Sequence, residues 1–173
     1  SDADQVRLLA ERKVSQLRMS GFVASRNIED DTINFGNPNL VPERKWEYRA
    51  GYERRFAEDA GSLEVEWFYA RISGLIDRIT DGNGGSGTGN IGLGEKYGVD
   101  VKANVRFGFI NVPNAVLTLN YKYTGSNVMD PFTGKNRIIR YTTPHYWDVK
   151  FQHDVTEYDF TYGFSAHRRS VMK

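Results

Sequence analysis

Residues 96–109 read K-Y-G-V-D-V-K-A-N-V-R-F-G-F, and apolar and polar side chains alternate throughout this stretch. The odd-numbered residues are tyrosine, valine, alanine or phenylalanine, whereas the even-numbered ones are charged, polar or glycine. Because successive side chains of a β-strand point to opposite faces of the sheet, this pattern predicts a long strand. One face of it is apolar and the other needs water or ionic partners, which is typical of outer-membrane barrel strands.

The same alternation recurs along the chain and predicts an all-β fold, an antiparallel meander of about seven strands. The first dozen residues are ambiguous, because R-L-L-A-E-R-K also suits a helix by propensity, but Val6, Leu8 and Ala10 fit one strand face. Between Phe68 and Ile72 the alternation degrades, and we expect a face switch or a bulge there. The other strands are expected near residues 45–56, 63–69, 96–109, 115–124, 145–155 and 158–166.

Long and short connections alternate between these strands. The long ones are predicted at Met19–Arg44, Asp81–Glu95 and Gly125–Pro144, and the short ones near Asp59, Pro113 and Thr156. Bacterial outer-membrane barrels have short periplasmic turns and longer extracellular loops. We therefore expect the three long connections to lie outside the cell and the strands to belong to a large transmembrane β-barrel.

Composition excludes several function classes. Lysine and arginine number 23 against 22 acidic residues, a net charge of +1 without a basic stripe, so nucleic acid is not an expected partner. The absence of cysteine excludes disulfides and thiol chemistry. A mean hydropathy of -0.57, with no apolar run of about 20 residues, excludes a helical membrane span.

Candidate catalytic and metal motifs have simpler explanations. The segment Gly87–Gly92 matches G-x-G-x-x-G, but it leads into a strand rather than the helix that a dinucleotide site requires. The three histidines show no metal-ligand spacing, and Glu29, Asp30 and Asp31 suit a solvated loop better than a cation site. No nucleophile motif is present. We predict neither an enzyme nor a cofactor or metal requirement.

Several blocks of sequence resemble TonB-dependent outer-membrane receptors in their order and spacing. These are G-N-P-N-L-V-P-E at 36–43 before K-W-E-Y-R-A-G-Y-E-R-R-F, F-Y-A-R-I-S-G-L-I-D-R-I at 68–79, G-N-I-G-L-G-E-K-Y-G-V-D-V-K-A at 89–103, and D-P-F-T-G-K at 130–135 before P-H-Y-W-D-V-K-F. Such transporters have roughly 22 strands. Residues 1–173 are therefore interpreted as one partial β-barrel region, with the plug and the remaining strands absent.

The resemblance implies active uptake of a scarce small molecule, such as a ferric siderophore, in the bacterial outer membrane. The implied partners are the TonB energy-coupling complex, reached through the missing plug, and outer-membrane lipid. Arg49, Lys102 and Arg106 are the candidate lumen-facing residues, which would meet the plug or the ligand path. The resemblance does not indicate which ligand is taken up.

Aromatic residues are expected to form two girdles at the membrane boundaries. Trp46, Tyr97, Tyr123, His145 and Trp147 would form the outer girdle, and Phe56, Phe107, Phe109 and Tyr158 the inner one. Two alternatives stay open. A soluble, lipocalin-like barrel would bury the apolar faces around an apolar ligand, and a passive or structural outer-membrane barrel would share the strands without TonB coupling.

Overall fold

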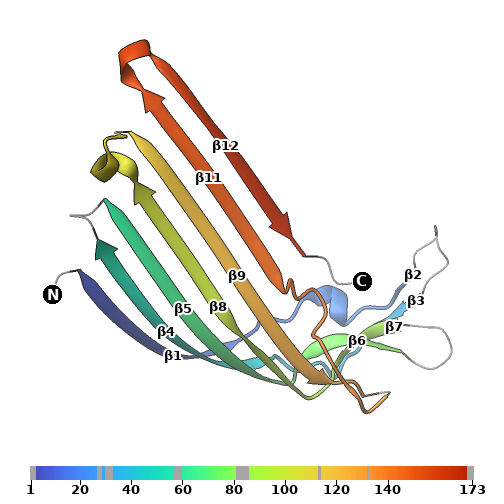
Figure 1. Cartoon of the computed structure of the whole chain (residues 1–173). Helices are drawn as coiled ribbons and strands as arrows, with labels where there is room; N and C mark the ends of the chain where they lie inside the picture. The colour runs from blue at the N-terminus through green and yellow to red at the C-terminus, as the bar shows by residue number, and fades with distance from the viewer. Residues whose placement is uncertain are drawn as a thin grey trace.

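The computed structural model describes residues 3–26, 29, 33–56, 60–80, 86–112, 114–131 and 133–170. Seven long antiparallel strands form one open, curved sheet in the order β1-β4-β5-β8-β9-β11-β12 (Figure 1). They are β1 (Asp4–Val14), β4 (Arg44–Phe56), β5 (Gly61–Ser73), β8 (Leu93–Arg106), β9 (Ala115–Met129), β11 (His145–Val155) and β12 (Phe160–Arg169). The prediction of an all-β meander of about seven strands, part of a barrel, is confirmed. Among the described residues, no helix is long and apolar enough for a membrane span.

The register of strand pairing sorts the side chains onto two faces. In β8, Val101 pairs with Val65 of β5 and Tyr121 of β9, whereas its neighbour Lys102 pairs with Glu64 and Asn120. We call the first the apolar face and the second the charged face. Pairing is continuous through β5, so the bulge expected between residues 68 and 72 is wrong. Phe68 and Ile72 are apolar residues that lie on the charged face, and the strand pairing on both sides of them is regular.

The apolar face is bare along the long strands. Leu8 is 80% exposed and Trp67 is 52% exposed, although both side chains are strongly apolar. No described residue forms a second layer over this face, which a soluble barrel would bury. Exposed aliphatic and aromatic side chains on a sheet this wide indicate a surface that another apolar phase covers.

The long connections contain structure that the sequence did not predict. A second sheet has the order β2-β3-β7-β6, formed by β2 (Ser25–Arg26), β3 (Ile33–Phe35), β7 (Ser86–Asn90) and β6 (Ile76–Thr80). A further strand, β10 (Asn136–Arg137), pairs with β9. The three segments predicted as loops are therefore partly strands, and β8 and β9 extend further toward them than expected. These elements gather at one rim of the main sheet (Figure 1).

At the opposite rim, the described parts of the connections are short. Two of them are 3-10 turns, Phe107–Ile110 and Thr156–Tyr158, and a third such turn, Met19–Gly21, lies in the first long connection. The strand that was expected to continue through Phe109 ends at Arg106, because the 3-10 turn begins at Phe107. Asn111, the residue after this turn, has a left-handed backbone conformation (φ 60°). The expected turns near Asp59 and Pro113 fall on residues outside the described ones. Long and short connections lie on opposite rims, as predicted (Figure 1).

A small apolar core holds the long connections against the charged face of the main sheet. Ile72 of β5 and Val128 of β9 pack against Leu75 and Ile139 of the connections, and all four side chains are buried. The backbone N–H of Ile139 donates to the Ser126 hydroxyl at 3.1 Å, so the connection is also tied to β9 by a hydrogen bond. The long connections thus fold over the charged face of the sheet.

Gly98 permits a close contact at the centre of the charged face. A Cβ at this position would lie 2.0 Å from the carbonyl oxygen of Tyr123 and 2.8 Å from the ring of Phe68. The first clash is with backbone, which cannot rotate away. Only glycine allows β9 and the Phe68 ring to approach β8 this closely.

We predict that Gly98→Ala lowers the free energy of unfolding by about 1–3 kcal/mol, because the added methyl group overpacks a contact with backbone. Urea titration in detergent micelles measures the change. Gly108→Ala is the matched control, since a Cβ there meets no atom within 4 Å. Equal stability of the two variants would contradict the packing role of Gly98.

Candidate functional site

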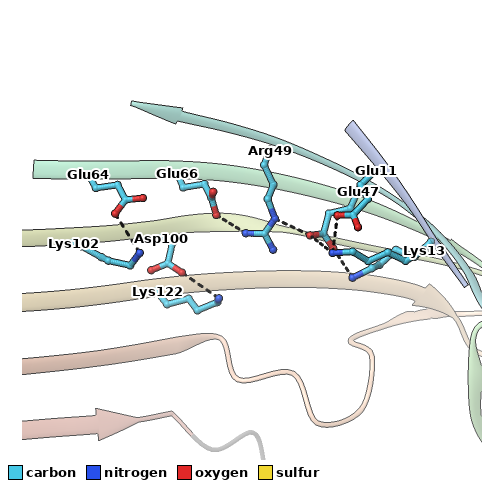
Figure 2. Close-up of polar contacts among 10 residues, drawn as sticks. Glu11, Lys13, Glu47, Arg49, Glu64, Glu66, Asp100, Lys102 and Lys122 are labelled. Carbon is cyan, nitrogen blue, oxygen red and sulfur yellow. Dashed lines mark hydrogen bonds and ion pairs between the residues drawn. The ribbon is translucent and has the colours of Figure 1, made fainter. Parts of the chain in front are cut away.

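An ionic network covers the charged face near the rim of the long connections (Figure 2). Its centre is Glu47, whose residue surface is only 3% exposed. The Glu47 carboxylate accepts a 2.7 Å contact from Arg49 Nε, lies 3.6 Å from Lys13 Nζ, and also pairs with Lys45. Three cations around one buried carboxylate compensate the cost of removing its charge from water.

The network continues across the sheet because the register places opposite charges on neighbouring strands. Arg49 also pairs with Glu66 of β5. Farther along, Glu64 of β5 lies 3.2 Å from Lys102 of β8, and Asp100 of β8 lies 3.2 Å from Lys122 of β9 (Figure 2). These outer pairs are partly exposed, so each contributes little stability by itself. Together they form a charged wall that crosses β4, β5, β8 and β9.

Phe68 is an aromatic platform within this charged wall. The Arg49 guanidinium carbon lies 5.8 Å from the ring centroid and the Lys122 ammonium nitrogen lies 5.7 Å from it. Both distances suit cation–π attraction. The ring therefore links the cations of β4 and β9 across the space above Gly98.

The three residues predicted to line the lumen all lie on the charged face. Arg49 and Lys102 belong to the ionic network, as described above. Arg106 lies apart from them at the opposite rim, where it lines a hollow of about 340 Å³ with Arg55 and Asn104. Among the described residues, Arg106 makes no ion pair. The structure thus groups two of the three residues and separates the third.

A second polar cluster fixes the long connections to one another. The Arg137 guanidinium contacts Asp130 at 2.7 Å and Asp77 of β6 at 2.9 Å, although Arg137 and Asp77 are 60 residues apart. Burial lowers the pKa of Arg137, but hydrogen bonds to the two carboxylates raise it more, so the net shift is upward. The guanidinium therefore stays charged and joins two separate connections.

Beside this cluster, the connections enclose a hollow of about 530 Å³, which we call the loop hollow. Arg78, Arg140 and Tyr141 line it together with residues 86–88 of β7. Arg140 lies 5.6 Å from the ring centroid of Tyr141, a residue that is 94% exposed and has a φ of 60°. Left-handed backbone is costly for a tyrosine. Sequence reasoning missed these residues, because no alternation or motif marks them.

The remaining candidate motifs show no metal or nucleotide geometry. Among the described residues, no group of three histidine, aspartate or glutamate side chains could hold a metal ion. His145 instead contacts the Tyr121 hydroxyl at 3.0 Å, and His153 contacts that of Tyr162 at 2.9 Å. The G-x-G-x-x-G match lies on β7, an antiparallel partner of β6 that no helix follows. Asp30 and Asp31 fall outside the described residues.

The rings assigned to the outer girdle lie on the apolar face near the rim of the long connections. Trp46 stacks against Tyr48 with ring centroids 6.4 Å apart, and Tyr123 lies 5.2 Å from the His145 ring. At the opposite rim, Phe107 stacks on Phe109 at 6.3 Å in the turn after β8. Aromatic side chains therefore flank the bare apolar band at both ends.

A family model described as "TonB dependent receptor-like, beta-barrel" matches residues 13–169. The chain belongs to this family. A solved structure, the siderophore receptor PirA from Acinetobacter baumannii, is similar with a TM-score of 0.62 and 14% sequence identity. The similarity covers 91% of this chain and 25% of the PirA chain, so the chain spans about a quarter of that receptor's length. No curated protein matches the chain.

Family membership supports a receptor or transport role, since the family is not a class of enzymes. The family is located in the outer membrane. The likeness to PirA, at 14% identity, concerns the fold alone. The apolar face, the charged face and the two rims of this TonB-dependent receptor barrel agree with the arrangement in such barrels.

We predict that Arg137→Met loosens the long connections, because it leaves the buried Asp77 carboxylate without its cation. Limited proteolysis should cut the connections at least several times faster in this variant, while the long strands stay protected. Lys135→Met is the matched control, since this exposed neighbour loses a charge without breaking an ion pair among the described residues. Equal cleavage rates in the two variants would exclude a fixing role for Arg137.

Proposed function

We propose that this chain forms part of the barrel wall of an outer-membrane receptor that takes up a scarce ligand, such as a ferric siderophore, with energy relayed through TonB. The single observation that carries this proposal is the match of residues 13–169 to the receptor barrel family. The ligand class is part of the proposal: the solved receptor of similar fold is named for a siderophore, and we propose a ligand of the same class here. The plug and the remaining strands would come from outside this sequence.

The proposed orientation places the charged face toward the lumen and the apolar face toward lipid. Two observations support it: the long connections pack over the charged face through Ile139 and Leu75, and the apolar face is bare. Arg49 and Lys102 would then line the aqueous interior within the ionic network. Arg106 would do so near the periplasmic end. All three would contact the plug or the ligand path.

The loop hollow is the proposed first contact for the ligand. Two arginines and Asp77 line it, and Arg137 pairs with both Asp77 and Asp130. Three arginines therefore face two carboxylates, and the balance of charge at the hollow is positive. The exposed ring of Tyr141 adds an apolar contact beside the cations. Such a combination suits an anionic ligand with flat, unsaturated groups, because guanidinium groups bind anions and stack on rings.

The alternatives make different demands on the same strands. A soluble, lipocalin-like barrel needs the apolar face inside, which disagrees with the family match and with the exposure of Leu8 and Trp67. A passive or structural barrel has the same lipid-facing side and needs no energy. Energy dependence of uptake therefore separates the proposed receptor from the passive alternative.

We predict that Val101→Asp abolishes assembly into the outer membrane, because a charge at the bilayer midplane on the lipid-facing side is destabilising, somewhat less for an aspartate than the about 2–4 kcal/mol of an arginine or lysine. Heat-modifiable migration of the outer-membrane fraction on a denaturing gel measures assembly. Asn104→Asp adds the same charge to the charged face of the same strand and should assemble normally. Normal assembly of both variants would contradict the proposed orientation.

We predict that the complete receptor supports uptake of a radiolabelled ferric siderophore at nanomolar concentration, and that collapsing the proton-motive force stops it. Binding to the cell surface should persist after the collapse, because only translocation uses energy from the inner membrane. The assay is run in cells that lack other siderophore receptors, over a panel of siderophore classes. Uptake that continues without the proton-motive force would identify a passive barrel.

The same assay tests the loop hollow. Replacing Arg78 and Arg140 together by glutamine should weaken surface binding by at least about tenfold, since each lost charged hydrogen bond is worth about 1.5–3 kcal/mol. Lys135→Gln, which removes a charge from the same connection outside the hollow, is the control. Unchanged binding by the double variant would move the ligand site elsewhere.

A further inference from the structure

We propose that the hollow of about 340 Å³ at the rim of the short connections is an anion-binding site, which the transported ligand occupies as it leaves the lumen. We call it the mouth hollow. The inference rests on the proposed function and orientation, in which this rim faces the periplasm. It goes beyond them by naming a second ligand site and the charge of its ligand. The lining residues are Arg55, Ala60, Gly61, Ser62, Asn104 and Arg106.

The register brings the polar residues of the mouth hollow together on the charged face. Ser62 of β5 is the direct cross-strand partner of both Arg55 of β4 and Asn104 of β8. Arg106 follows Asn104 by two residues on the same face of β8. With strands about 4.8 Å apart and a rise of about 3.4 Å per residue, the Cα atoms of Arg55 and Arg106 lie about 12 Å from each other. The two long side chains therefore reach one small molecule from opposite sides.

Backbone hydrogen bonds fix both arginines near the ends of their strands. The N–H of Arg55 donates to the carbonyl oxygen of Ala3 at 2.7 Å, and the N–H of Arg106 donates to that of Ala60 at 2.6 Å. On its other side, Arg106 pairs with Val116 of β9. The side chains are exposed, but the backbone that carries them belongs to the sheet. A site on strands is held more precisely than one on loops.

The mouth hollow has an excess of positive charge. Within the part of the chain that the structure describes, no acidic residue lines it and Arg106 makes no ion pair. The Nε atom of Arg55 lies 3.3 Å from the Glu53 carboxylate, but this carboxylate is also 2.7 Å from the Arg7 guanidinium. One carboxylate is thus shared by two arginines, and a guanidinium group has five N–H donors. Donors of both Arg55 and Arg106 are left for a ligand outside the chain.

The lining chemistry and the volume select a small anionic molecule. Guanidinium groups bind oxyanions through charge-assisted hydrogen bonds. The Ser62 hydroxyl and the Asn104 amide add two neutral donors, and neither makes a side-chain hydrogen bond to a described residue. The volume of about 340 Å³ lies within the range of about 300–1,000 Å³ that is usual for small-molecule sites. A single carboxylate side chain of the plug would leave most of it empty.

The mouth hollow repeats the chemistry of the loop hollow at the other end of the charged face. Two arginines line each of them. Between the two hollows, the ionic network pairs Arg49, Lys102 and Lys122 with carboxylates. A ligand that binds the loop hollow through its negative charge therefore meets a second pair of arginines at the periplasmic end.

The test measures the electrostatic potential in the mouth hollow with an introduced thiol. Ser62→Cys is made in the complete receptor in mild detergent, with any cysteine outside residues 1–173 replaced by serine, since this sequence has none. An anionic and a cationic methanethiosulfonate reagent are compared by their modification rates, each divided by its rate with a free thiol. We expect the anionic reagent to be favoured at least about tenfold, because two nearby cations attract it. The additional substitutions R55Q/R106Q should abolish the preference.

Two further arms give the control and the ligand class. Lys150→Gln is the matched control, because exposed Lys150 shares a row of the charged face with Asn104 but lies outside the hollow. It should leave the preference unchanged. A millimolar concentration of the anionic ferric tris-catecholate complex should slow modification of the thiol several-fold, whereas the neutral ferric tris-hydroxamate complex should not. Heat-modifiable migration confirms that each variant is folded before it is compared.

The uptake assay tests the exit role of the mouth hollow. R55Q/R106Q, with Ser62 retained, should lower the maximal uptake rate several-fold and leave the Kd for surface binding unchanged, because the arginines act only after the ligand has left the loop hollow. Asn104→Asp, which adds a negative charge to the hollow, should act in the same direction. A maximal rate equal to that of the unmodified receptor in both variants would overturn the exit role.

Equal normalised rates for the two reagents would overturn the anion site, as would protection of the thiol from both, since another part of the receptor would then fill the hollow. Equal slowing by the anionic and the neutral complex would also overturn it. The thiol assay is independent of transport. Energy-dependent uptake without an anion preference would refute the mouth hollow and leave the proposed function standing. An arginine-dependent anion preference without uptake would support the anion site and refute the proposed function.

Discussion

Continuous strand register is the constraint on which the other features depend. A slip of one residue between two strands would exchange their faces, because side chains alternate with a period of two. Glu47 would then point into the apolar face without Lys13 of the neighbouring strand, and Phe68 would leave the space above Gly98. The ionic network and the bare apolar face are two consequences of one pairing pattern.

The ionic network also reinforces that register. Glu64 reaches Lys102 and Asp100 reaches Lys122 when the strands pair as they do, and a shifted register separates these two pairs. Each pair is weak because water screens it. Their combined effect is selectivity among registers, which neutral threonine or serine at the same positions would not provide as strongly.

The long strands could be predicted from the sequence because, in a sheet with one apolar and one charged face, the polarity of each residue indicates the face on which it lies. The prediction failed where an apolar side chain has another task. Phe68 and Ile72 looked like a break in the pattern, yet one is a cation–π platform and the other anchors the loop core. Phe107 and Phe109 continue the alternation of apolar and polar residues, but they lie in a 3-10 turn. The alternation alone does not show where the backbone leaves the strand conformation. The glycines of β7 have no side chains from which to detect a strand.

The pairing of charged side chains could not be predicted from the sequence either. The near balance of 23 basic and 22 acidic residues suggests that every cation has an acidic partner. The structure distributes them unequally: Arg137 bridges Asp77 and Asp130 across distant segments, whereas Arg12, Arg44 and Arg71 pair with no described carboxylate. Composition gives only the sum, and the pairing depends on contacts between connections that no local pattern encodes. The role of an unpaired cation can be inferred only when the face and the rim of the sheet on which it lies are known.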